Sequence, residues 1–537
     1  MTTYLHFGTY AAATLRNQGI AQGLGCGPIT LSWFNQLAHA DGRQALEVVD
    51  VAHEAILTPT ERTILTPSLW YQNALSGTIY VATQGSQIGS GSIDNPVNLG
   101  TVCSALCLIA PGSTIVIQAG EYVGDFVFTH AGTALERITI AFRDEAIVKG
   151  SFTVGGNYLD VVSLDVYDAP AGRFTEEIGS APSFMRHEGL SIFGHHVNIV
   201  HPRVMNILGN GVGFWQTSID SVLYGMWVLN NGWLAPDRGH GHAPYTQNEA
   251  SGSKLLRNLM LAPQYGGALR VYTTNQNLER VTVDRCICIS DQLFLGGHSP
   301  ASQCVITNNT VWNADLEIGE TDRGNVDVLI DGNYVASSLN TRCFVYRFWG
   351  RLTVTNNTFV MRQDNSVGLL GEYLRLSPSV ENINHNIYYY QQRADGKYFT
   401  LYDYAVEPPS VTYLTIAQWQ ALGYDTNSTF IEGLPASNRV FVEHSEYDND
   451  IAHVAIYNWE NLGSVPVDFS GGNLTLTNTY HAYNAMNPGE HHSFTYDGEP
   501  VPIPMTGWTR AIPAGDTEPL TSDPWPLFGA FVVKPAP

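Results

Sequence analysis

Short segments of alternating apolar and polar residues recur through the middle of the chain, and the most regular of them follow a 24-residue period. A polar anchor recurs in successive segments at Arg285, Asn309, Asn333 and Asn357. A single segment of this kind cannot bury its apolar face, whereas stacked copies bury a continuous core. A propeller blade needs four strands in roughly 40–45 residues. The period therefore predicts the coils of a parallel β-helix.

The asparagine that recurs at the bend of these segments has a structural explanation. Asparagine tolerates the left-handed backbone conformation, and stacked asparagine amides form ladders. The same bends match the N-glycosylation sequon at Asn308 and Asn356, and two later segments match it at Asn427 and Asn473. Because the first two matches recur at one position of the repeat, we expect a structural ladder there rather than glycosylation.

The composition restricts the partners that the chain can bind. Charged residues make up 14% of the sequence, below the ~25% of an ordinary soluble domain. The formal net charge of −23 argues against nucleic acid, whose phosphates need clustered Lys and Arg, and against an anionic membrane surface. No apolar stretch is long enough to insert into a bilayer. The seven cysteines are too few for a disulfide scaffold, and we expect buried, small apolar residues.

We expect an all-β chain in four parts. Residues 1–76 form a small N-terminal module for assembly or attachment, and residues 77–395 form a right-handed parallel β-helix. Residues 396–435 form a linker with a short helix, and residues 436–537 form a β-sandwich-like domain that caps the open end of the coil or binds glycan. An early amphipathic helix is expected around Val102–Ala110.

Several segments resemble right-handed parallel β-helix proteins of the pectate-lyase-like superfamily. The similar segments are GTIYVATQGSQIGSGSIDNPVNLG (77–100), PGSTIVIQAGEYVGDF (111–126), GNGVGFW (209–215), NNGWLAPDRGHGHAPYTQN (230–248) and NRVFVEHSEYDNDIAHVAIYNWEN (438–461). The resemblance runs from about residue 77 to residue 537. It implies the fold but no single reaction, because the superfamily includes polysaccharide lyases, glycoside hydrolases, epimerases and phage tailspikes. Since tailspikes usually associate in threes, it also implies a homotrimer.

The richest polar constellation follows Trp233 and supplies five of the six candidate catalytic residues, which are Asp237, Arg238, His240, His242 and Tyr245. On a strand, residues two apart share a face, so both histidines are expected to point the same way. The sixth candidate, Glu188, lies about two turns of the coil earlier, which places it on the same long face.

Three chemistries fit this constellation, beside a purely structural role. His and Asp side chains can hold a divalent metal. A His or Tyr can abstract a proton from C5 of a uronic acid while Arg238, Arg257 or Arg270 stabilises the carboxylate and enolate. Glycoside hydrolysis needs two carboxylates about 5–10 Å apart, and Asp237 can pair with Glu249, Asp220 or Glu188.

Flat aromatic rings and hydrogen-bonding groups near this constellation suggest a polysaccharide surface. The candidate substrate-binding residues are Trp215, Trp233, Gln247, Asn248, Arg257, Arg270 and Tyr272. Of the aromatic residues, we expect Trp233 and Tyr245 to be exposed. A carboxylate-rich segment makes Ca²⁺ the one cofactor worth testing, although a solvated acidic edge is the simpler expectation; its members are Asp315, Glu317, Glu320, Asp322 and Asp327.

The sequence thus predicts a protein that binds polysaccharide, with cleavage by a lyase or a glycoside hydrolase left open. The N-terminal sequence lacks the charged and apolar regions of a signal peptide, so we expect a virion component or a secreted protein whose leader was removed. The alternative is a structural or adhesive surface protein without turnover.

Overall fold

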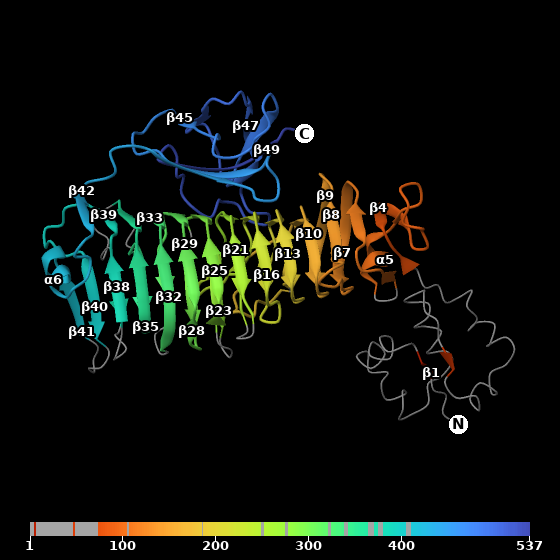
Figure 1. Ribbon diagram of the computed structural model, residues 1–537, viewed down its shortest axis with the longest axis horizontal. Helices are drawn as coiled ribbons and strands as arrows, with labels where there is room; N and C mark the ends of the chain where they lie inside the picture. The colour runs from red at the N-terminus through yellow and green to blue at the C-terminus, as the bar shows by residue number, and fades with distance from the viewer. Residues whose placement is uncertain are drawn as a thin grey trace. The chain divides into compact units, whose positions relative to one another are not determined.

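The computed structural model describes residues 5–6, 47–48, 74–104, 107–184, 186–248, 252–273, 278–290, 292–319, 324–337, 342–362, 370–373, 380–403 and 410–537 (Figure 1). Apart from two short paired strands, β1 (Leu5–His6) and β2 (Glu47–Val48), and the start of β3 (Ala74–Leu75), the expected module at 1–76 lies outside the described residues. The chain is all-β, and its β-solenoid has about 10 turns. The β-helix expected from the 24-residue period is therefore confirmed.

Contacts divide the chain into two compact units, of which the first comprises residues 1–147 and 152–161. In this unit β4 (Thr78–Ser86), β6 (Thr114–Ile117) and β8 (Ile138–Phe142) pair in parallel. The early helix, α5, spans Leu99–Cys103 and is capped by the Asn98 side chain, which accepts from the Thr101 amide at 2.7 Å. The expected position at 102–110 was wrong, because the segment Leu108–Ile109 is strand β5 and pairs with β3.

The second unit, residues 148–151 and 162–537, contains most of the coil. Each turn contributes one strand to each of three parallel stacks. The first stack runs through β13 (Val197–Val200), β16 (Ser221–Tyr224), β21 (Lys254–Arg257), β25 (Val281–Asp284), β29 (Cys304–Thr307), β32 (Asn325–Asp331), β35 (Trp349–Thr355) and β38 (Val380–Asn384). Alternate residues of these strands are buried, as in Val197, Ile199 and Ile306, which is the period-2 pattern of strands with one face in a core.

We call the second stack the covered sheet. It consists of β11 (Asp165–Tyr167), β14 (Arg203–Met205), β17 (Trp227–Leu229), β22 (Met260–Leu261), β26 (Ile287–Ile289), β30 (Thr310–Trp312), β33 (Tyr334–Ser337), β36 (Thr358–Met361), β39 (Ile387–Tyr390) and β42 (Thr429–Glu432).

We call the third stack the open sheet. It consists of β12 (Leu190–Ile192), β15 (Val212–Phe214), β20 (Tyr245–Thr246), β23 (Leu269–Thr273), β27 (Leu293–Gly297), β31 (Leu316–Ile318), β34 (Phe344–Arg347), β37 (Leu370–Tyr373) and β40 (Phe399–Asp403).

The bend between the first stack and the covered sheet carries the predicted asparagine ladder. The Asn309 backbone amide and side-chain amide both donate to Asn333 Oδ1 at 2.9 Å. Asn333 donates in the same way to Asn357, again at 2.9 Å, and Asn357 to Asn386. The left-handed backbone lies one residue earlier, as at Asn308 (φ 56°). Two properties of asparagine are therefore used at adjacent positions, one for the bend and one for the ladder.

The last turn is closed by the segment that was expected to be a linker. Strand β41 (Ser410–Leu414) pairs antiparallel with β40. Helix α6 (Ile416–Ala421) begins with a capping box between Thr415 and Gln418. Its Trp419 is fully buried, stacks on Phe399 at 4.6 Å between ring centroids, and donates to Asp425 Oδ2 at 2.8 Å. Residues after β39 therefore bury the apolar end of the coil.

The C-terminal strands form a five-stranded antiparallel sheet and a two-stranded one. The first is ordered β43 (Arg439–His444), β44 (Ala452–Tyr457), β49 (Phe528–Pro535), β46 (Thr479–Asn484) and β47 (Asn487–Thr495); the second pairs β45 (Ser464–Val467) with β48 (Val501–Pro504). They share an apolar core that includes Val454, Val467 and Ile503. These strands belong to the same compact unit as the coil, so the boundary at residue 436 stays a prediction.

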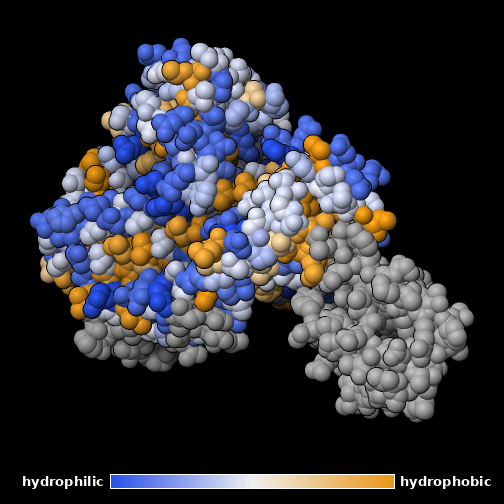
Figure 2. Space-filling model, turned by 45° about the vertical axis from the view of Figure 1, so that its right-hand side comes forward, coloured by the Kyte–Doolittle hydropathy of each residue, from blue (hydrophilic) through white to orange (hydrophobic). Residues whose placement is uncertain are grey.

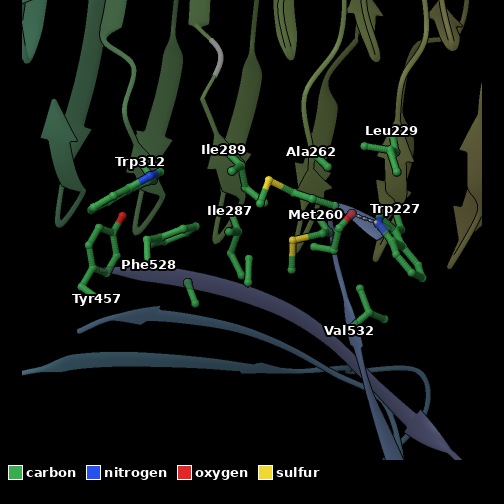
Figure 3. Packing of buried hydrophobic residues seen from close by; sticks show 14 of the residues in the cluster. Trp227, Leu229, Met260, Ala262, Ile287, Ile289, Trp312, Tyr457, Phe528 and Val532 are labelled. Atoms are coloured by element: carbon green, nitrogen blue, oxygen red, sulfur yellow. Dashed lines mark hydrogen bonds between the residues drawn. The ribbon is translucent and has the colours of Figure 1, made fainter. Parts of the chain in front are cut away.

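The C-terminal strands pack on the side of the coil, along the covered sheet. One buried cluster joins Trp227, Met260 and Ile287 of the coil to Tyr457 and Phe528 of the C-terminal strands (Figure 3). These strands therefore do not cap the open end of the coil, and the alternative, that they bind glycan, stays a prediction. The physical reason is the apolar outer surface of the covered sheet from β14 to β36, which is removed from water by these strands.

Polar contacts fix this arrangement. The Trp227 indole N–H donates to the Ala485 carbonyl at 2.9 Å, and His201 Nε2 lies 2.8 Å from Ser445 Oγ. The Arg257 guanidinium pairs with Glu446 at 3.0 Å. Because these contacts join residues more than 180 positions apart, no local sequence pattern could predict them.

The remaining surface is mixed. Hydrophobic and hydrophilic side chains are interspersed over the visible face (Figure 2). Among the described residues, no helix is long and apolar enough to cross a membrane. The described cysteines are free thiols, and five of them are buried, namely Cys107, Cys286, Cys288, Cys304 and Cys343, as expected for small apolar side chains.

Candidate functional site

The outward side of the open sheet carries a continuous series of aromatic rings, which we call the aromatic face. Neighbouring rings have centroids 5.9, 5.9, 6.3 and 6.3 Å apart, in the order Phe193, Trp215, Tyr245, Tyr272 and Phe294. The parallel register brings them together, because Gly213 pairs with Tyr245, Tyr245 with Arg270, and Arg270 with Phe294. Each turn of the coil thus adds one ring to the row, and neighbouring strands of the sheet lie about 4.8 Å apart.

A glycine makes room for the indole ring of this face. A Cβ atom added at Gly213 would lie 2.6 Å from the Trp215 ring, so only glycine permits the ring to lie over the strand. Trp215 is half-buried, and Phe193, stacked on it at an interplanar angle of 17°, is 46% exposed. Phe294, at the other end of the row, is 4% exposed, so the flat apolar surface that the aromatic face offers to solvent comes from Phe193, Trp215, Tyr245 and Tyr272.

Glu188 and His242 meet at one end of this face through Asn210. The Asn210 amide donates to Glu188 Oε1 at 3.1 Å, and its carbonyl oxygen accepts from the His242 backbone amide at 2.8 Å. Glu188 precedes β12, and Asn210 and His242 precede β15 and β20, so the three residues occupy equivalent corners of successive turns. The structure thus brings together two predicted residues that are 54 positions apart.

Burial makes the Glu188 carboxyl a weaker acid than an exposed one. Desolvation raises the pKa of Glu188 to about 7, although Arg186 and the hydrogen bond from Asn210 act in the opposite direction. The second oxygen, Oε2, is buried without a hydrogen-bond partner among the described residues. A carboxyl group with a pKa near neutrality is suited to proton transfer at physiological pH.

His242 is held as a neutral imidazole. Burial and the positive charge of Arg270 lower the pKa of His242 to about 3. Its Nδ1 lies 3.3 Å from the Gly267 carbonyl oxygen. Because a carbonyl only accepts hydrogen bonds, Nδ1 carries the proton and Nε2 keeps its lone pair. His242 can therefore accept a hydrogen bond from a hydroxyl group.

Tyr245 and Arg270 stand side by side on paired strands. Burial raises the pKa of Tyr245, and the nearby Tyr272 and Glu188 act in the same direction. The phenol therefore keeps its proton at neutral pH and can donate it. The Arg270 guanidinium lies 4.7 Å from the Tyr272 ring centroid and 4.3 Å from that of Phe294, which orients a fixed positive charge within the aromatic face.

The predicted block around His240 has a different arrangement from the one expected. Trp233 was expected to be exposed, but only 1% of its surface is accessible. Strands β18 (Trp233–Leu234) and β19 (Gly239–His240) form an antiparallel pair that stacks the Trp233 and His240 rings at 5.0 Å. The expectation of exposure was wrong because a local hairpin buries the indole.

The two histidines also contact different groups. Strand β19 ends at His240, and Gly241 adopts a φ of +85°, so the alternation expected of a continuous strand is broken. His240 lies 3.4 Å from Asp237 Oδ1, which also accepts from the Gly179 amide at 3.1 Å. The hydrogen bond from Gly179 and that with His240 lower the pKa of Asp237, which makes this carboxyl a poor general acid. The Arg238 guanidinium forms an ion pair with Asp237 at 2.6 Å, and the Arg238 side chain is 61% exposed.

Three predicted substrate-binding residues divide between the aromatic face and the scaffold. Gln247 is half-buried and hydrogen-bonds Tyr245, so it lies beside the aromatic face. Asn248 is buried, and its amide donates to the Gly252 and Glu279 carbonyls at 2.8 and 2.6 Å. Arg257 lies on β21 of the first stack and pairs with Asp284 at 2.7 Å. Asn248 and Arg257 thus have structural partners away from the aromatic face.

Two members of the acidic segment, Asp315 and Glu317, do not form the solvated edge that was expected. Burial, together with the charge of Glu317, raises the pKa of Asp315 to about 6. Glu317 forms an ion pair with Arg347 and accepts from the Gln292 side chain at 2.6 Å. Glu320, Asp322 and the alternative partner Glu249 lie outside the described residues. Within the described part of the chain, no group of three or more His, Cys, Asp or Glu side chains is placed to hold a metal ion.

Two residues of the site escaped the sequence reasoning. Asn210 lies in the segment GNGVGFW, and because a glycine stands on each side of it, the sequence suggests only that Asn210 is part of a turn. Phe294 follows Arg270 by 24 residues, so the coil period could have placed it beside Arg270. The period was a usable signal for Phe294, whereas nothing local marks Asn210 as a bridge.

Searches for relatives found similarity only at the level of solved structures. No protein-family model and no curated protein matches the chain. A mannuronic-acid-specific polysaccharide family 6 lyase from human gut microbiota is 13% identical, with 56% of this chain and 79% of that chain covered and a TM-score of 0.31. The tailspike gp49 of the Acinetobacter baumannii bacteriophage Fri1, a capsular polysaccharide depolymerase, is 10% identical, with 79% of each chain covered and a TM-score of 0.28.

A third similar structure is an adhesin. PfbA, a surface adhesin of Streptococcus pneumoniae, is 10% identical, with 64% of this chain and 89% of that chain covered and a TM-score of 0.35. The parallel β-helix itself is shown by the strand pairing of this chain. At these identities and TM-scores the likeness says nothing of what this β-helix binds or whether it cleaves.

Proposed function

We propose that this β-helix binds an acidic polysaccharide along the aromatic face and cleaves it by β-elimination beside Glu188. The observation that carries the proposal is that Tyr245 and Arg270 lie on paired strands within the row of aromatic rings, while Glu188, two turns before Tyr245, is joined to His242 through Asn210. The rings supply stacking surface for a polymer, and the three polar groups supply the charges and protons that elimination needs.

Each polar residue has one task in this reaction. Arg270 pairs with the carboxylate of a uronic acid and so stabilises the negative charge that develops on it. Glu188, in its ionised form, takes the proton from C5, and the electrons of the C5–H bond form a C4=C5 double bond. The bond between C4 and the glycosidic oxygen breaks, and Tyr245 donates its proton to that oxygen. Proton exchange with solvent then restores Glu188 and Tyr245.

His242 and Asn210 have positioning roles. The Asn210 amide holds the Glu188 carboxyl at 3.1 Å, and the free lone pair on His242 Nε2 can accept a hydrogen bond from a sugar hydroxyl. We propose elimination rather than hydrolysis because the site combines a base, Glu188, a proton donor, Tyr245, and a fixed positive charge, Arg270.

The test is cleavage of a panel of uronic-acid polysaccharides by the wild-type chain and by Glu188→Gln. We expect new absorbance at 235 nm from unsaturated uronates, and a loss of about 10²–10⁴-fold in kcat/KM for the variant. Since the reacting form of Glu188 is ionised and its pKa is about 7, activity should rise as pH increases through about 7. Arg351→Ala, an exposed substitution on the first stack, is the matched control and should keep full activity.

The outcomes separate the candidate functions. New reducing ends without absorbance at 235 nm would assign hydrolysis instead of elimination. Binding without either product would assign an adhesive role. We also propose that the protein works outside the cell, secreted or on a virion, as a homotrimer; light scattering coupled to size-exclusion chromatography tests the trimer.

A further inference from the structure

A cavity of about 380 Å³ lies where strand β43 begins beside the covered sheet. It is separate from the aromatic face, which belongs to the open sheet. Its lining combines aromatic rings, amides and hydroxyls with one positive charge, from Tyr334, Asn356, Thr358, Tyr389, Ser437, Asn438, Arg439 and Phe441. Its volume is in the range of small-molecule sites.

The floor of the cavity is built by three successive turns. Tyr334 pairs with Thr358, and Thr358 with Ile387, at the starts of β33, β36 and β39. Tyr389 lies two residues further along the last of these strands, so it faces the same side. The floor thus presents a hydroxyl between aromatic and aliphatic surface.

Hydrogen bonds hold the wall in place. The Asn438 backbone N–H donates to Glu460 Oε2 at 3.2 Å, and the Glu460 backbone N–H donates to Asn438 Oδ1 at 2.8 Å. The Tyr334 hydroxyl accepts from the Trp459 indole N–H at 2.9 Å. A ligand therefore meets a preformed site and loses little free energy in ordering it.

The charge of the cavity is unusual for this chain. The chain carries a net charge of −23, yet the lining includes Arg439 and no Asp or Glu. The Arg439 guanidinium lies 5.1 Å from the Phe441 ring centroid. Within the described residues it forms no ion pair, so its hydrogen-bond donors are available to a ligand with an acidic group.

We propose that this cavity binds a carboxylate-bearing sugar residue of an acidic polysaccharide, as a second attachment point. Arg439 pairs with the carboxylate, Phe441 and Tyr389 contact the sugar ring, and Asn356, Thr358 and Ser437 bind its hydroxyls. A single arginine among rings and amides suits one carboxylate better than a polyphosphate, which requires several cations. The site does not depend on cleavage at Glu188.

Isothermal titration calorimetry tests the site with four probes, namely trigalacturonate, trimannuronate, a hyaluronan tetrasaccharide and neutral cellotetraose. The experiment uses the full chain in a Glu188→Gln background, so that no probe is consumed. We expect Ser437→Trp, which fills the cavity from its exposed rim, to remove one binding site per chain. Arg439→Ala should weaken the affinity of that site for an acidic probe at least about tenfold.

Arg351→Ala is the matched control for the loss of one exposed arginine, and thermal unfolding of each variant checks the fold. An unchanged number of sites in Ser437→Trp would overturn the proposal. So would equal binding of cellotetraose and the acidic probes at the cavity. A failure of the proposed function would look different, because the wild-type chain would then release no product and Tyr272→Ala would leave binding unchanged, while the cavity still titrates.

Discussion

The covered sheet and the open sheet belong to the same coil and are both rich in aromatic residues, yet they differ in how far their outward rings are buried. On the covered sheet Trp227 and Trp312 lie under the C-terminal strands, and Trp312 stacks on Phe528 at 4.8 Å with an interplanar angle of 9°. On the open sheet Trp215 and Tyr245 remain half-buried. The difference teaches that a row of aromatic residues on a solenoid becomes core or ligand surface according to what covers it.

The largest expected effect separates the two sheets by stability. Trp312→Ala should lower the free energy of unfolding by about 3–5 kcal/mol, since it leaves a cavity in a fully packed cluster. Trp215→Ala is the matched substitution on the open sheet, and it should cost about 1 kcal/mol or less because the ring is partly exposed. Urea unfolding followed by far-UV circular dichroism measures both. Equal losses would show that the aromatic face is part of the core.

The second prediction concerns the histidine that joins the covered side of the coil to Ser445. Burial and the nearby Lys534 lower the pKa of His201 to about 4, from about 6.5 in an unfolded chain. Between these values the unfolded chain binds the proton more tightly than the folded one, so stability falls as pH decreases from about 6.5 to about 4. The contribution lost over this range is about 3 kcal/mol, at 1.36 kcal/mol per pKa unit.

The comparison of wild type with His201→Asn measures this contribution together with its coupling to His453, whose pKa the charge of His201 lowers. Burial raises the pKa of Glu443 and of Glu188 to about 7, and these groups change stability in the opposite direction as pH falls. Both remain in the variant, so they cancel in the difference. The stability advantage of the wild type should shrink between pH 6.5 and pH 4. A constant difference over that range would contradict the assigned pKa.

The smallest expected effect concerns binding on the open sheet. Tyr272→Ala should weaken binding of an acidic oligosaccharide about tenfold, or about 1.4 kcal/mol, through loss of stacking surface and of the ring that orients Arg270. It should change the free energy of unfolding by less than about 1 kcal/mol. Calorimetric titration and urea unfolding of the same variant measure the two quantities. A large loss of stability with unchanged affinity would reverse the roles assigned to the two sheets.

Much of the coil could be read from local patterns. Asn309, Asn333 and Asn357 marked the bend and its ladder, because a repeat in sequence becomes a column in space when the turns have equal length. The same logic placed Glu188 on the long face that carries His242. It failed at Trp233 and His240, where a positive φ at Gly241 and a hairpin of two short strands, β18 and β19, interrupt the period.

The sequence by itself determined the solenoid, its period and its ladder, because these depend on residues within about one turn of each other. Only the tertiary structure decided which aromatic residues are covered. The Trp227 indole binds a carbonyl at Ala485, 258 residues away, and no pattern within a turn encodes that pairing. It also decided the acidity of Glu188, because a pKa depends on burial and on charges that come from other turns.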